Sequence, residues 1–300
     1  MAFTGYEVPI TLPPLRRVRY SSLLGSIQEL VVQPLRNGPN GFTDTNTRRW
    51  QFGVKFVPRD CKPLRTLGAD CAPVNKIVDL YEDVTTQPAF TLYDGLQCSI
   101  LSNNPAEMAQ QLTNNLDVLA SAIFANELVS GLASGGNSLS STAAVPLGGL
   151  NSLPISAALN FLEDELGVRL QGAVGMIHVT PGVLGALVRN GSVRIEGDSY
   201  TSPSGHTVVG DAGYVTPGIG MLPPVGQPLA VDGQEWMYAS GPVLYKQSPI
   251  DELGEDIEQM DWARNTLLKL QEKYGILVFE PCPVIAVLAC FEVCGCGPEV

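Results

Sequence analysis

Histidine and charged residues are both scarce in this sequence. It holds only two histidines in 300 residues, and 16% of its residues are charged, against roughly 25% in typical soluble domains. His178 lies within an apolar stretch and His206 lies in a Ser-Gly-His-Thr turn, and neither has a nucleophile or base at a recognisable catalytic spacing. We therefore predict a core role for the first and a loop position for the second.

Motifs of hydrolases and nucleotide-binding enzymes are also missing. The chain has no Gly-x-Ser-x-Gly segment and no glycine-rich loop that ends in Gly-Lys-Ser or Gly-Lys-Thr. The sequence thus points to no catalytic residue and no cofactor. An enzyme built from the two histidines and the acidic residues of 251–261 is the least favoured function.

Long hydrophobic runs are absent as well. No stretch reaches the roughly 18 apolar residues of a membrane span, and the N-terminus lacks the apolar core of a secretory signal. We expect a protein that is made and kept in the cytoplasm and has no membrane partner. Its 45% hydrophobic content is enough for a large core in one elaborated domain or two domains.

Cysteine is present, but its pattern excludes the usual frameworks. The seven cysteines are odd in number and spread over the chain, which favours reduced thiols over a disulfide scaffold. Cys294 and Cys296 lack both the paired spacing and the histidines of a zinc site. No metal is therefore expected.

The charges that the chain does have are unevenly distributed. Residues 1–80 hold 11 Lys/Arg and 6 Asp/Glu, whereas residues 81–300 hold 7 Lys/Arg and 24 Asp/Glu. Opposite potentials would favour docking of the first part on the acidic body of a neighbouring copy. The alternative is ordinary solvated charge. Tight DNA binding is disfavoured, because the acidic body would repel phosphate.

These charges and the neighbouring aromatic residues suggest a contact between subunits. The acidic residues near position 255 do not follow a calcium-loop spacing, so they form either a solvated face or a docking site for basic residues of a neighbour. The predicted contact residues are Arg16, Arg17, Arg19, Arg48, Arg49, Trp50, Phe52, Lys55, Glu255, Asp256 and Glu258.

The first eighty residues show little sign of a core of their own. Prolines and glycines interrupt residues 1–34, which predicts an extended arm with one helical turn near 26–31. Alternating apolar residues predict a strand over 47–57 and a return strand near 74–80. Because an arm and a two-stranded ribbon bury little surface alone, both are expected to lie on another copy.

The strongest helix signal follows. Asn104, Pro105 and Glu107 form an N-terminal capping pattern, and apolar residues recur at three- to five-residue steps until Gly131. This predicts a helix of roughly 40 Å. The Gly/Ser-rich segment 131–150 is the clearest internal boundary.

Helices and strands alternate beyond this boundary. A helix over 262–274 is predicted because Leu267, Leu270 and Tyr274 would share one face. The other predictions are helices over 154–166 and 181–190, and strands over 174–179, 206–209, around Tyr214, 235–245, 276–279 and 283–293. The expected fold class is α+β.

Several segments and their order resemble one known family. QPAFTLYDGLQC at 87–98, GHTVVGDAGY at 205–214 with Trp236-Met237, DWARN at 261–265 and FEPCPVIAV at 279–287 look like segments of major capsid proteins from actinobacterial, mycobacteriophage-like tailed phages. The resemblance implies the Hong Kong 97-type capsid fold. It would make 1–35 the N-terminal arm, 36–80 the extended loop, 81–150 and 262–300 the peripheral domain with a spine helix over 104–131, and 151–261 the axial domain.

The family resemblance also implies a function. The chain would be a structural subunit that self-assembles as hexamers and pentamers into an icosahedral virion shell in the host bacterial cytoplasm, enclosing double-stranded DNA without specific binding. A separate scaffolding protein, a portal and decoration proteins are possible partners. The alternatives are a dedicated pentamer subunit and an encapsulin-like nanocompartment shell.

Overall fold

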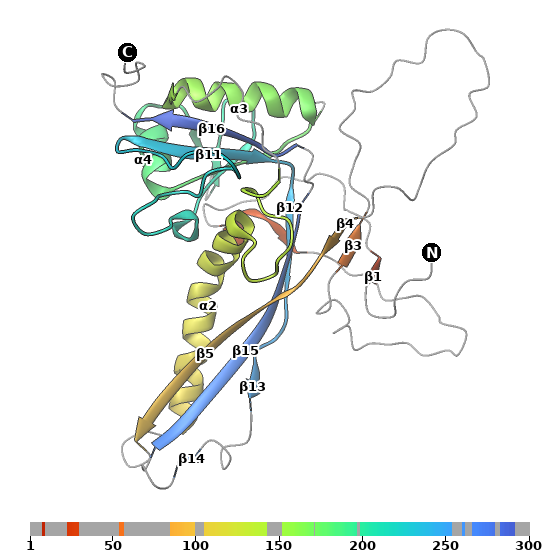
Figure 1. Ribbon diagram of the computed structural model, residues 1–300, viewed down its shortest axis with the longest axis vertical. Coiled ribbons are helices and arrows are strands. Elements are labelled where there is room, and N and C mark those ends of the chain that lie inside the picture. Colours follow the sequence, from red (N-terminus) through yellow and green to blue (C-terminus); the bar gives the residue numbers. More distant parts are fainter. Residues whose placement is uncertain are drawn as a thin grey trace, which may run out of the picture.

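The protein combines a lobe of sheet and helices with a long extension. The computed structural model describes residues 8–9, 23–29, 54–56, 85–99, 105–142, 152–170, 172–196, 199–253, 260–261, 266–279 and 283–291. Figure 1 shows the lobe around helices α3 and α4, and the extension in which helix α2 runs beside strands β5 and β15. Helices and strands mix throughout, so the expected α+β class is confirmed.

The lobe is built on a mixed seven-stranded sheet that is buried on both faces. Alternate residues of one strand enter different cores: Trp236 and Tyr238 pack toward α2, whereas Met237 and Ala239 pack toward α3 and α4. This double burial explains the nearly continuous apolar runs of the central strands. In sheet order the strands are β6 (Leu153–Pro154), β16 (Ile285–Cys290), β11 (Gln234–Ser240), β7 (Met176–Val179), β10 (Thr207–Gly210), β9 (Ser199–Thr201) and β8 (Arg194–Glu196).

Local sequence signals place the two helices of the lobe. Helix α3 spans Ile155–Arg169, and α4 spans Pro181–Arg189 with Thr180 as N-cap and proline in the first turn. Both match the predicted helices over 154–166 and 181–190. The strand predictions over 174–179 and 206–209 are likewise confirmed by β7 and β10.

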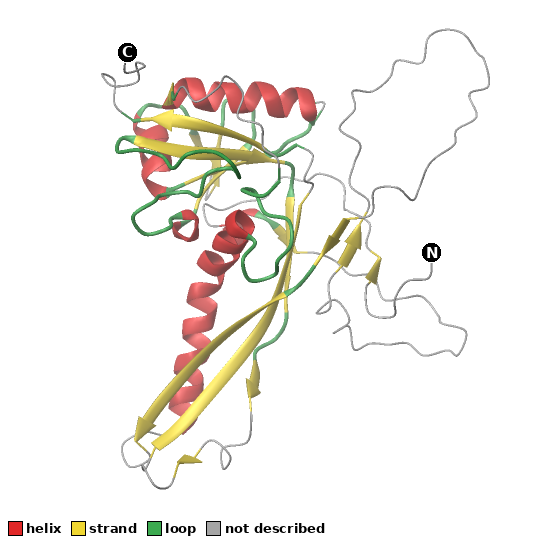
Figure 2. Ribbon diagram, viewed as in Figure 1, coloured by secondary structure: helices red, strands yellow, loops and turns green. Residues whose placement is uncertain are grey.

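The extension is a long antiparallel ribbon with α2 along it (Figure 2). Strands β5 (Phe90–Ser99) and β15 (Thr266–Phe279) pair over ten residues, from Thr266 opposite Ser99 to Gly275 opposite Phe90. Strand β12 (Val243–Gln247) extends this sheet and follows β11 of the lobe after two residues. The same sheet includes β13 (Asp251–Leu253) and β14 (Met260–Asp261).

Helix α2 spans Pro105–Ser130, in agreement with the predicted helix. It ends because Gly131 adopts a φ of 63°, a conformation that glycine reaches without strain. The buried carboxylate of Glu127 then accepts hydrogen bonds from the backbone N–H groups of Ala133 and Ser134, both at 2.9 Å. The turn after α2 is thus held by the helix itself.

Polar side chains join α2 to β15 at matching intervals. Thr113 Oγ1 donates to Gln271 Oε1 at 3.1 Å, and Lys273 Nζ lies 3.1 Å from Asp117 Oδ1. Four helical residues rise about 6 Å and two strand residues about 6.7 Å, so the two periods coincide along this contact. Closer to the lobe the contact becomes apolar, with Leu116, Phe124 and Leu128 in the core.

The predicted helix over 262–274 is wrong. Residues 262–265 lie outside the described part, and from Thr266 onward the chain is the strand β15. Leu, Lys, Gln and Glu favour helix as isolated residues, but pairing with β5 over ten residues overrides this local preference. The long strand includes the predicted strand over 276–279, and β16 includes much of the second closing strand.

Three further predictions need correction. Residues around Tyr214 form a short 3-10 helix, η2 (Ala212–Tyr214), and the predicted strand over 235–245 is two strands, β11 and β12. Cys290 is disulfide-bonded, contrary to the expectation of reduced thiols throughout. The bonding partner's side chain lies outside the described residues.

Part of the predicted N-terminal arm packs on its own chain. Helix α1 (Leu23–Ser26) buries Leu23 in the main core, and β2 (Gln28–Glu29) pairs in parallel with β12. Val8–Pro9, strand β1, pairs with β3 (Val54–Phe56), which also pairs with β4 (Thr85–Gln87). The idea that the whole arm lies on another copy is therefore wrong for these residues. The predicted return strand near 74–80 lies outside the described part.

A very close backbone approach joins α2 to the lobe. A Cβ placed on Gly213 of η2 would lie 1.9 Å from the carbonyl oxygen of Ala122. No side chain fits at this distance without separating α2 from η2. Glycine at 213 is therefore a packing requirement.

Gly213→Ala is expected to lower the free energy of unfolding by about 1–3 kcal/mol or more, because it overpacks this junction. Gly185→Ala is the matched control, since Gly185 lies mid-helix in α4 and a Cβ added there would meet no atom within 4 Å outside the helix's own backbone. It should raise stability by up to about 1 kcal/mol. Urea unfolding of the purified protein measures both changes in stability, and equal changes would contradict the close approach of Gly213 to Ala122.

Candidate subunit-contact surface

The predicted contact residues remain a prediction. Ten of them, Arg16 to Phe52 and Glu255 to Glu258, lie outside the described residues. The backbone of Lys55 lies in β3, opposite Thr86 of β4. The described part of the chain therefore neither brings these residues together nor separates them.

The structure does assemble one buried polar cluster in the lobe. His178 of β7 has its Nδ1 2.9 Å from the Tyr214 hydroxyl and its Nε2 2.8 Å from Ser240 Oγ. The single hydroxyl proton of Ser240 is donated to the Gly241 carbonyl oxygen at 2.8 Å. The tautomer in which Nε2 donates to Ser240 and Nδ1 accepts from Tyr214 satisfies all of these contacts.

This arrangement differs from that of a catalytic serine and histidine. In a serine hydrolase the imidazole accepts the serine proton, whereas in this tautomer the imidazole donates to the serine. All three side chains are almost fully buried. Burial lowers the pKa of His178 to about 3 and raises the pKa of Tyr214, so both groups stay neutral. The predicted core role of His178 is confirmed.

His206 is more buried than a loop position suggests. It immediately precedes β10, is only 4% exposed, and accepts a hydrogen bond from the Gly175 N–H at Nδ1 over 3.0 Å. Burial lowers its pKa, and the nearby Glu163 carboxylate partly opposes that shift. Glu163 in turn accepts from the Ser204 N–H at 2.8 Å. Together, the hydrogen bonds of His206 and Glu163 hold the turn before β10 in place.

Asp211 is an acidic residue whose role the sequence alone did not reveal. Its Oδ2 accepts from the Leu23 N–H at 3.0 Å and from Ser121 Oγ at 2.8 Å, and its Oδ1 accepts from the Gly213 N–H at 2.9 Å. One carboxylate thus connects α1, α2 and η2. The Asp-Ala-Gly sequence is a recognisable capping signal, but it does not indicate the two distant partners.

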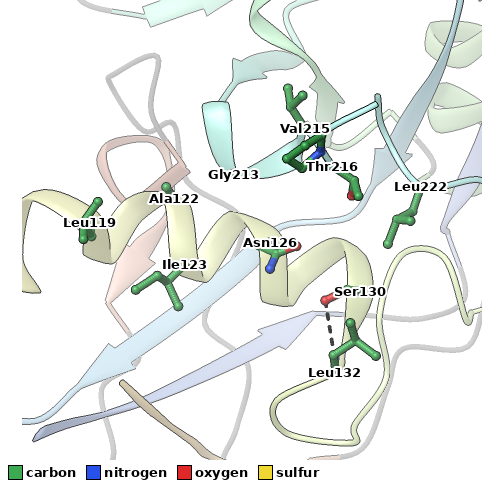
Figure 3. Close-up of a pocket in the computed structure, with 11 residues that line it drawn as sticks. Leu119, Ala122, Ile123, Asn126, Ser130, Leu132, Gly213, Val215, Thr216 and Leu222 are labelled. Atoms are coloured by element: carbon green, nitrogen blue, oxygen red, sulfur yellow. Dashed lines mark hydrogen bonds between the residues drawn. The ribbon is translucent and has the colours of Figure 1, made fainter. Parts of the chain in front are cut away.

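Apolar side chains line a groove at the same junction (Figure 3). This α2 groove has a volume of about 430 Å³ and lies between α2 and the segment that follows β10. No charged residue lines it. Its lining residues are Leu119, Ala122, Ile123, Asn126, Ser130, Leu132, Gly213, Val215, Thr216, Pro217 and Leu222.

Sites of other kinds are not found in the described residues. Within them, no group of three or more His, Cys, Asp or Glu side chains is placed to hold a metal ion. The helices that the structure describes include none that is long and apolar enough to cross a membrane.

A solved capsid structure shares the fold over nearly the whole chain. A chain from the capsid of an empty GTA particle aligns with 98% of this chain and 98% of its own length, at 13% identity and a TM-score of 0.53. The chain has a capsid-protein fold. This likeness confirms the expected phage-capsid resemblance for the fold alone, because the identity is low.

Other matches are weaker. A chain of Gordonia phage Cozz covers 80% of this chain and 81% of its own, at 13% identity and a TM-score of 0.48. A chain of an encapsulin complex from Synechococcus elongatus aligns with 70% of this chain and 76% of its own length, at 10% identity and a TM-score of 0.43. No protein-family model and no curated protein matches the chain.

The buried His178 predicts a pH dependence of stability. Its pKa is about 3 in the folded protein, against 6.5 for an ordinary histidine. Between these values only the unfolded chain binds the proton, so the free energy of unfolding falls as the pH drops below about 6.5, by up to about 1.4 kcal/mol per unit. Above that pH its contribution is constant.

His178→Gln removes the titrating group while retaining hydrogen-bonding capacity. Urea unfolding between about pH 5 and 7.5 should therefore give a shallower slope for the variant than for the unmodified protein. His206 and the carboxylates titrate in both proteins, so their contributions largely cancel in the difference. Identical slopes would show that His178 is not buried in a neutral form.

Proposed function

We propose that this chain is the shell subunit of a tailed-phage-type virion, which self-assembles as hexamers and pentamers into an icosahedral capsid around double-stranded DNA. The observation that carries the proposal is the shared fold with a GTA capsid chain over 98% of both chains.

The described residues support this function in two ways. The contact between the His178 and Ser240 side chains is buried, and the Ser240 hydroxyl is within hydrogen-bond distance of the Gly241 carbonyl oxygen. The α2 groove provides an uncharged apolar surface on an otherwise acidic body. Such a surface suits contact between proteins better than contact with DNA.

Self-association would be the main interaction of the chain, and the proposed domains follow from it. Residues 1–35 and 36–80, apart from the segments that pack on their own chain, would reach neighbouring copies through the predicted contact residues. Residues 81–150 and 262–300 would form the peripheral domain, and 151–261 the axial domain. Many modest contacts between copies then sum to a stable closed shell. Scaffolding, portal and decoration proteins would be separate chains.

Expression of the chain alone in bacteria tests this function. Electron microscopy of the purified material should show closed shells with hexagonal and pentagonal clusters of subunits. Shells built only of pentamers would indicate the dedicated vertex role, and shells filled with a protein cargo instead of DNA would indicate a nanocompartment. A monodisperse monomer with hydrolase activity would contradict the shell function.

A truncation separates packing within a copy from contact between copies. Deletion of residues 1–22 keeps Leu23 in the core and removes, among the described contacts, only the two-residue strand β1, so it should lower the stability of the subunit little while abolishing shells. Leu23→Ala is expected to lower the free energy of unfolding by roughly 2–5 kcal/mol. Size-exclusion chromatography and urea unfolding measure the two effects. Normal shells from the truncated chain would refute an interlocking arm.

A further inference from the structure

The α2 groove combines apolar walls with an unusual lack of charge. Residues 81–300 hold 24 acidic and 7 basic residues, yet none of these lines the groove. Two copies of such an acidic body repel each other at most approaches. An uncharged patch is where they can meet without this repulsion.

Exposed apolar side chains form the rim of the groove. Leu132 is 83% exposed, Leu119 51% and Val215 42%, although all three are large apolar residues. Single exposed apolar residues are common on protein surfaces, but a contiguous group around a groove marks an interaction site. Figure 3 shows Leu119 on α2 and Leu132 in the turn that follows α2, with Val215 across the groove from the helix.

The walls of the groove are held in place by buried contacts. Gly213 lies against the Ala122 backbone, and the Tyr238 hydroxyl donates to the Leu222 carbonyl oxygen at 2.7 Å. Asp211 fixes the Gly213 N–H from the other side. A surface that is already ordered loses little conformational entropy when it binds.

We propose that the α2 groove receives an apolar segment from a second copy of this chain. The apolar walls would bury the side chains of that segment, while Asn126, Ser130 and Thr216 would hydrogen-bond to its backbone. The proposal rests on the proposed function, because a second copy is then the partner present at highest local concentration. The inference goes beyond the proposed function because it identifies the surface at which the second copy binds.

Photo-crosslinking tests the identity of the occupant. Benzoylphenylalanine at position 132 places a reactive ketone at the rim, and unlabelled copies are mixed with ¹⁵N-labelled copies before assembly. Mass spectrometry should find crosslinked peptide pairs that combine both isotopes. The control is the same crosslinker at Val168 of α3, which is 75% exposed and outside the groove.

Two substitutions at the same position test the chemistry. Leu132→Asp adds a negative charge at the rim and should raise the protein concentration needed for assembly by at least about tenfold. Leu132→Met keeps an apolar side chain of similar volume and should assemble normally. Both should unfold at the same urea concentration as the unmodified chain, because the side chain is 83% exposed.

The outcomes separate this inference from the proposed function. Crosslinks confined to one isotope would show that the chain covers its own groove. A yield of mixed-isotope crosslinks from position 132 that is no higher than the yield from position 168 would also overturn the inference. Shells that form without crosslinks at 132 would leave the shell function standing and remove the groove from it. Mixed-isotope crosslinks without closed shells would support the groove contact and count against the shell function.

Discussion

The carboxylate of Asp211 is the contact on which the rest of the arrangement depends. It accepts hydrogen bonds from the start of α1, from the middle of α2 and from η2 of the lobe, and it is itself buried. Without it, the buried Leu23 N–H would lose its acceptor, at a cost of about 1–3 kcal/mol, and two partly buried donors would lose theirs at a smaller cost. The same contact positions Gly213 against Ala122 and so defines one wall of the α2 groove.

The sequence predicted elements whose signals are local. Helices α2, α3 and α4 and strands β7 and β10 carry their own caps, breakers or apolar runs, and all were expected at close to their observed positions. The strand β15 was not expected over 266–274. Its partner β5 lies about 170 residues earlier in the chain, and its buried face presents Lys269, Gln271 and Lys273. Polar residues at alternate positions do not indicate a buried strand unless the helix above them is known.

The candidate site shows the same limit. The α2 groove is formed by residues of α2 and residues near 215 that no periodicity connects, and its α2 residues are apolar ones that a sequence pattern assigns to a core. His178 was correctly placed in the core from its apolar neighbours. Its partners Tyr214 and Ser240 come from distant segments, so neither they nor the direction of the proton chain could be inferred.

The matched spacing of α2 and β15 determines the length of the extension. Apolar surfaces slide over one another with little change in energy, but Thr113 with Gln271 and Asp117 with Lys273 are paired in only one alignment. The alignment of helix and strand is therefore fixed, because a shift of one residue along either element would break both pairs. Each copy of the chain then extends its tip by the same distance from the lobe, and an identical reach is what the proposed shell would require of repeated copies.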